Sequence, residues 1–91
     1  MKYFLKPSYI RSVRKLGAAR AGKAQAAFEQ LVLLLEKGEI TPGLGVKQLR
    51  HGLWEIRAGL LDRIVFRRAG ANVEMILAGT HDEIRRFLKN C

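Results

Sequence analysis

Apolar and polar positions alternate with a period of two residues along two neighbouring runs near the middle of the chain, at 53–58 and 62–66. This alternation is typical of strands with one buried face, and the short turn between the runs predicts an antiparallel hairpin. Glu55, Arg57 and Arg63 fall on the opposite, charged face. The residues predicted to be buried are Trp54, Ile56, Ala58, Ile64 and Phe66.

Apolar residues recur at helical spacing in the N-terminal half of the chain. They predict a short helix from Pro7 to Gly17 and a longer helix from Ala18, which Gly38 ends as a C-terminal cap. The apolar stripe of the longer helix is Ala24, Ala27, Phe28, Leu31, Leu34 and Leu35. Its alanine-rich first half predicts an antiparallel pair with the preceding helix, covering a sheet. We interpret the stripe as core, because it sustains no heptad of the kind that forms a zipper.

The remaining patterns predict three more strands and one more helix. The strands are expected at 2–5, 46–50 and 73–78, and the helix at 82–89, where acids come first and bases last. His51 and Gly52 are expected to turn the second of these strands toward the hairpin. Together the elements predict an α+β fold in a single domain, 1–91. In this fold two N-terminal helices pack on one face of a small antiparallel sheet, and a short helix ends the chain.

Charge narrows the choice of partner. The 91 residues hold 17 Lys and Arg against 8 Asp and Glu, a formal charge of +9. Such a surplus favours a polyanion, with nucleic acid first, an acidic protein second and an anionic membrane third, although a basic surface can also serve solubility alone. Cys91 is the only cysteine, so neither an intramolecular disulfide nor a thiolate metal cluster is expected. Without a signal-like segment or a membrane-length apolar run, a cytoplasmic location is expected.

Common enzyme signatures are missing from the sequence. It has no glycine-rich phosphate loop, metal-binding histidine pair or serine nucleophile elbow, so we expect neither a metal nor a cofactor. What remains is a group of cations on neighbouring strands: Lys47, Arg50, Arg57 and Arg63. Guanidinium groups match phosphate oxygens and stabilise charge that develops in a transition state. Scattered arginines on a solvated strand face are the alternative interpretation.

Three further residues could belong to a site. His81 follows an apolar strand and could transfer a proton near neutral pH, or simply occupy a turn. Asp62, which alternation places with the apolar side chains, could orient or accept a proton, or end a turn beside Arg63. Phe87 could stack on a base, although an aromatic residue in a terminal amphipathic helix is more often core packing.

The order of these motifs resembles a known family. The run VKQLRHGLWEIR, followed by DRIVFRR, an apolar strand and GTHDEI, is similar to the RelE/ParE superfamily of toxins from toxin-antitoxin systems. Lys47, Leu49 and Gly52 resemble the K-x-L-x-G element of that superfamily, with one residue inserted before the glycine. The strand that starts at Arg63 resembles its R-hydrophobic-hydrophobic-aromatic strand. The G-T-H element that ends at His81 resembles the YafQ branch, within a group that also includes HigB-like toxins.

The resemblance implies a RelE-like fold and a ribosome-dependent mRNA endonuclease that needs no metal and cleaves by attack of the ribose 2′-hydroxyl. It implies proton transfer by His81 and charge stabilisation by Arg63. Arg57 would bind phosphate, and Asp62 matches an aspartate of the YafQ branch. The residues expected to contact RNA are Lys47, Arg50, Arg85 and Phe87. The partners would be mRNA on the ribosome and an acidic cognate antitoxin, in a hetero-oligomer with the toxin.

Two other functions stay open on the sequence alone. ParE-like toxins of the same superfamily inhibit DNA gyrase and lack the nuclease residues, and a basic domain can also bind RNA or the ribosome without catalysis. A shared fold cannot decide among these three, because function depends on the residues of the site.

Overall fold

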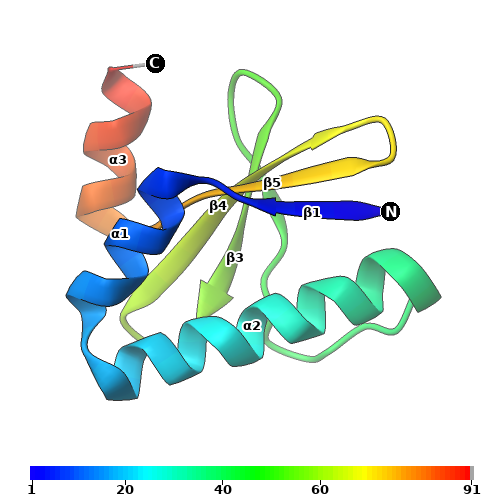
Figure 1. Cartoon of the computed structure of the whole chain (residues 1–91), viewed down its shortest axis with the longest axis horizontal. Coiled ribbons are helices and arrows are strands. Elements are labelled where there is room, and N and C mark those ends of the chain that lie inside the picture. Colours follow the sequence, from blue (N-terminus) through cyan, green and yellow to red (C-terminus); the bar gives the residue numbers. More distant parts are fainter. Residues whose placement is uncertain (91) are drawn as a thin grey trace.

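The computed structural model describes residues 1–90 and shows a five-stranded sheet with helices packed on it (Figure 1). The elements are β1 (Lys2–Leu5), α1 (Pro7–Leu16), α2 (Ala18–Lys37), β2 (Lys47–Gln48), β3 (Leu53–Ala58), β4 (Asp62–Ala69), β5 (Asn72–Thr80) and α3 (His81–Lys89). This arrangement confirms the predicted α+β fold with two N-terminal helices and a short C-terminal helix. Cys91 lies outside the described residues.

The strands lie in the order β1-β5-β4-β3-β2. Strands β2 to β5 form the expected antiparallel meander, but β1 pairs with β5 in parallel, so the sheet is not wholly antiparallel. The second predicted strand is shorter than expected, with only Lys47 and Gln48 paired. The turn that follows it is at the predicted place, and both His51 and Gly52 have positive φ there, 60° and 73°.

The face of the sheet that α1 and α2 cover, here called the inner face, carries the main core. Ile56, Ile64 and Phe66 are 0%, 0% and 3% exposed, which confirms the predicted register of the central hairpin. Ala24 and Leu31 of α2 are fully buried against them. The apolar stripe of α2 is therefore core, as expected.

The two N-terminal helices do not form the antiparallel pair that the sequence suggested. They meet at a corner at Gly17, whose positive φ of 83° is one that glycine adopts most easily, and each extends over a different part of the sheet (Figure 1). Helix α1 packs on β5, whereas α2 packs on β3 and β4. The small Ala24 and Ala27 therefore bring α2 close to the strands. Gly38 caps α2 with φ 70°, as predicted.

Strand β5 contains an irregularity that the apolar pattern concealed. Val65 pairs with Leu77 and Phe66 pairs with Met75, so Ile76 is an extra residue, as in a β-bulge. The extra residue shifts the alternation by one position. Met75 before it and Ala78 after it both belong to the inner core, whereas Ile76 and Leu77 both pack on the other face. The nearly continuous apolar run therefore serves two cores.

The second face of the sheet, here called the outer face, is partly covered by α3. Ile84 of this helix is 1% exposed and packs with Leu53 and Val65 of the sheet. Helix α3 thus covers part of the face on which the sequence placed Arg57 and Arg63. No helix within residues 1–90 combines the length and the apolar character needed to cross a membrane.

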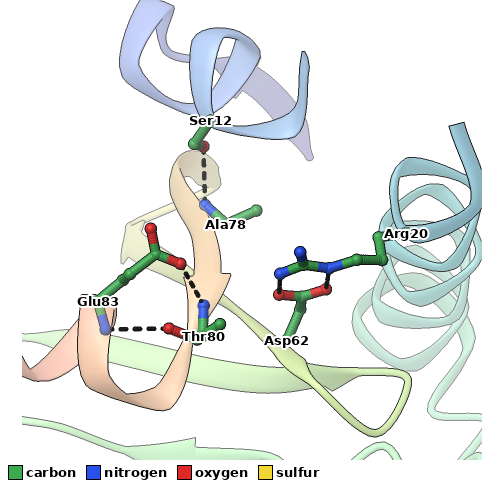
Figure 2. A network of polar contacts seen from close by, with 6 residues as sticks. All are labelled: Ser12, Arg20, Asp62, Ala78, Thr80 and Glu83. Carbon is green, nitrogen blue, oxygen red and sulfur yellow. Dashed lines mark hydrogen bonds and ion pairs between the residues drawn. The ribbon is translucent and has the colours of Figure 1, made fainter. Parts of the chain in front are cut away.

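Helix α1 also closes the edge of β5 that β1 leaves unpaired. Ser8 Oγ donates a hydrogen bond to the Ile76 carbonyl at 2.6 Å. Ser12 Oγ accepts one from the Ala78 amide at 2.9 Å, as Figure 2 shows. These side chains replace the missing neighbouring strand, so the end of β5 that leads into α3 is held from both sides.

Candidate functional site

Two arginines face each other on the uncovered part of the outer face. Arg57 on β3 and Arg63 on β4 are directly paired in register, and Gly79 of β5 is the next residue across the sheet from Arg63. The predicted placement of the two arginines on one face, opposite the buried Ile56 and Ile64, is confirmed. Two arginines thus stand on adjacent strands of this face, Arg57 exposed and Arg63 half-buried.

The loop before β2 shapes the position of Arg57. The Arg57 amide donates to the Leu44 carbonyl at 2.8 Å, so this loop lies along the edge of β3. A Cβ atom at Gly45 would stand 3.1 Å from the Arg57 side chain, and Gly45 has a φ of 62°. Glycine therefore suits this position both for its backbone conformation and because the arginine lies against it.

A buried acid holds Arg63. Arg63 Nη1 lies 2.7 Å from Glu55 Oε2, and the two side chains are 28% and 5% exposed. Glu55 is also directly opposite Lys47 of β2. The sequence analysis placed Glu55 on this face but did not include it among the candidate site residues. The sequence feature that could have indicated it is a single acid among alternating cations, because a buried acid must be paired.

His81 is the first residue of α3, one position earlier than the predicted start of the helix, and it is exposed. A capping box fixes this helix start: Thr80 Oγ1 accepts from the Glu83 amide at 3.3 Å, and Glu83 Oε1 accepts from the Thr80 amide at 2.9 Å (Figure 2). The bond from the Thr80 backbone amide is the largest cause of the lowered pKa of Glu83. His81 is therefore carried on an ordered helix start, two residues beyond the position beside Arg63.

Asp62 is separated from this group. Its carboxylate is 1% exposed on the inner side and receives two bonds from Arg20 of α2, at 2.8 Å and 2.5 Å, in a parallel arrangement that Figure 2 shows. The hydrogen bond with Asp62 raises the pKa of Arg20 above its ordinary value. Because neighbours in a strand point to opposite faces, Asp62 cannot join Arg63. The structure thus gives Asp62 a structural partner, and we do not retain it among the candidate catalytic residues.

The predicted RNA-contacting residues lie in three places. Arg50 and Arg85 both line a cavity of about 400 Å³ between the β2–β3 turn and α3, whose full lining is Arg50, Asp82, Arg85, Arg86, Leu88 and Lys89. Four cations against one acid make this cavity suitable for an anion. Lys47 is exposed on β2, near Glu55. Phe87, in contrast, is partly buried and packs on the outer-face core.

Neither the family models nor the curated proteins that were compared contain a match to this sequence. Solved structures do match. A copper-bound toxin variant from Helicobacter pylori has a TM-score of 0.73 at 20% identity, over 92% of this chain and 98% of that one. The YoeB/ParE toxin from Agrobacterium tumefaciens has a TM-score of 0.66 at 20% identity, over 89% and 99%. The RelE in a RelB–RelE antitoxin–toxin complex from Methanococcus jannaschii has a TM-score of 0.69 at 12% identity, over 92% and 96%.

The chain has the RelE/ParE toxin fold. This finding confirms, at the level of fold, the resemblance that the sequence motifs indicated. The match extends over nearly the whole length of each compared chain, so the RelE-like fold accounts for β1 through α3 together.

Arg57 and Arg63 are groups of the kind that bind a phosphoryl oxygen, and His81 is exposed at the start of α3. Within residues 1–90, no group of three or more His, Cys, Asp or Glu side chains is placed to hold a metal ion. The cationic cavity along α3 is a second place that suits an anion.

Proposed function

We propose that this RelE-like protein is the toxin of a toxin-antitoxin system and an endoribonuclease that cleaves mRNA on the ribosome. The observation that carries the proposal is the uncovered row of Arg57 and Arg63, which lies beside the strand end that leads into His81. A phosphodiester seated on the two guanidinium groups would have an imidazole available for proton transfer. The two arginines would stabilise the charge that builds up as the 2′-hydroxyl attacks phosphorus.

The cationic cavity supports RNA as the substrate. Helix α3 leads from His81 at its N-terminus to the residues Arg85, Arg86 and Lys89 that line the cavity. A nine-residue helix is about 13 Å long, so an RNA strand that follows it could contact both places with different phosphates.

An acidic antitoxin is the partner we propose. Two of the similar structures are complexes, RelB with RelE and DinJ with YafQ. The formal charge of +9 would attract an acidic segment, and a segment that covers the arginine row would block access of RNA. Co-expression with the product of an adjacent small reading frame, followed by purification, tests this partnership. A protein that stays unbound and harmless beside that neighbour would contradict it.

The decisive experiment measures single-turnover cleavage of mRNA on programmed ribosomes. His81→Ala is expected to lower the rate about 100-fold or more and to leave ribosome binding largely intact, because it removes a proton-transfer group. Arg63→Ala is expected to lower the rate and also to weaken binding. Arg14→Ala, on the exposed side of α1, is the matched charge control and should cleave like the parent. A His81 variant as fast as the parent would contradict the proposed role.

Inhibition of DNA gyrase is the second candidate, favoured by the similarity to the YoeB/ParE toxin. Induced expression with RNA end mapping, together with a supercoiling assay, separates the two. New in-frame cuts support the nuclease. Growth arrest without cuts, accompanied by impaired supercoiling, supports gyrase.

A further inference from the structure

The candidate residues chosen from the sequence do not include a proton acceptor for the proposed reaction. Attack by a 2′-hydroxyl requires a group that accepts its proton, while a second group gives a proton to the leaving oxygen. Asp62 cannot be the acceptor at this site, because it is buried on the inner side with Arg20. Arg57 cannot be one either, because a guanidinium stays protonated in proteins. His81 alone cannot serve as donor and acceptor in the same step.

Glu55 is the carboxylate that the structure places among the site cations. Within residues 1–90 it is one of two buried charged side chains, the other being Asp62. Arg63 binds its Oε2 atom, Lys47 is directly opposite on β2, and Arg57 is two residues further on the same face of β3. The ion pair with Arg63 offsets the free-energy cost of burying this carboxylate.

The second oxygen of Glu55 has no protein partner among the described residues. Every buried side-chain oxygen or nitrogen there has a hydrogen-bond partner. The one side-chain hydrogen bond found for Glu55 is the bond from Arg63 to Oε2. Oε1 is therefore not fully buried, although the side chain as a whole is only 5% exposed, and it is the carboxylate atom left for a substrate.

We propose that Glu55 is the catalytic proton acceptor of this site, an inference that rests on the proposed ribonuclease function. The 2′-hydroxyl loses its proton to Glu55 Oε1, and the oxygen electron pair forms the new bond to phosphorus. The bond from phosphorus to the 5′-oxygen breaks, that oxygen keeps the electron pair, and the protonated His81 imidazole gives it a proton. The products are a 2′,3′-cyclic phosphate and a 5′-hydroxyl, and proton exchange with water restores both side chains.

Arg63 has two roles in this arrangement. Its Nη1 donates to Glu55 and fixes the carboxylate, while its remaining N–H groups can bind a phosphate oxygen. The ion pair thereby sets the position of the proton acceptor relative to the phosphodiester. The pairing is local, since the two residues belong to one hairpin and lie diagonally across it on one face, with the pair Ile56–Ile64 between their register positions.

The two buried acids provide a matched comparison. Glu55→Gln keeps the size of the side chain and an acceptor for Arg63 but cannot take up a proton, and Asp62→Asn makes the same change on the inner face. Single-turnover cleavage on programmed ribosomes is measured, with rates normalised to the folded fraction from circular dichroism. Glu55→Gln should lower the rate about 100-fold or more. Asp62→Asn should retain the parent rate per folded molecule.

Glu55→Asp covers the case in which Glu55→Gln fails to fold. It keeps a carboxylate but withdraws it by one methylene, so cleavage should slow. If Glu55→Gln, or Glu55→Asp in its place, cuts as fast as the parent, Glu55 is not the acceptor, although the nuclease function stands when His81→Ala is slow in the same assay. If the parent itself never cuts, both proposals fail together.

Discussion

Replacing Ser12 with alanine tests how the site is supported, because Ser12 holds the end of β5 that carries the chain into His81. Its Oγ atom accepts the hydrogen bond of the Ala78 amide at 2.9 Å, and Ala78 is 4% exposed. The variant leaves that buried amide without a partner, which costs about 1–3 kcal/mol. For a domain of this size we therefore expect the melting temperature to fall by about 4–24 °C. We also expect faster hydrogen exchange at the Ala78 amide.

Thermal unfolding by circular dichroism and amide exchange by NMR measure the two effects separately. Arg11→Ala is the control, because Arg11 is an exposed neighbour on the same helix, and its melting temperature should stay near that of the parent. The cleavage rate of Ser12→Ala should fall below the parent rate if a frayed strand end moves His81. An unchanged melting temperature together with undiminished protection of Ala78 would refute this account of the β5 edge.

Three further predictions concern the two faces of the sheet. Ile64→Ala removes a side chain that is 0% exposed, so urea unfolding should show a loss of about 2–5 kcal/mol, and a loss below 1 kcal/mol would contradict the assigned core. Arg20→Ala should lower the melting temperature more than Arg14→Ala, because it leaves the Asp62 carboxylate buried without its partner; equal melting temperatures would contradict this. The lowered pKa of Glu83 implies a stabilisation that is present at neutral pH and is lost as the pH falls below about 4.3 toward the folded-state pKa. The difference in melting temperature between the parent and Glu83→Gln should therefore shrink between pH 7 and pH 3.

The sequence predicted those features that depend on neighbours along the chain. The period-two alternation of the central hairpin correctly predicted that Ile56, Ile64 and Phe66 are buried. It also predicted that Arg57 and Arg63 share a face. Alternation is a strong constraint, because a shift of one residue in register would move every side chain to the other face. Two glycines marked the ends of both N-terminal helices: Gly17 and Gly38 adopt positive φ, and Gly38 is in the left-handed helical conformation.

Features that depend on distant contacts were not predictable in this way. The bulge at Ile76 looks in the sequence like one apolar strand, and only the pairing of Val65 and Phe66 with β5 shows that the run changes faces. The same change places Leu77 in the outer-face core with Ile84, so the packing of α3 on this face depends on the bulge. The partner of Asp62, 42 residues earlier in the chain, has no local signal at all.

The bulge also decides which residues can meet at the site. Without the extra residue, the alternation of Val73 and Met75 would continue along β5. Gly79 would then fall on the inner face, which α1 and α2 cover. With it, Gly79 lies on the outer face beside Arg63, where a Cβ atom would stand 2.9 Å from Glu83 Oε1, and α3 packs Ile84 on that same face. One inserted apolar residue thus sets the face of the strand end that leads into His81, while the regular pairing of β3 with β4 sets that of Glu55. The proposed donor and acceptor of protons therefore come from opposite sides of Arg63.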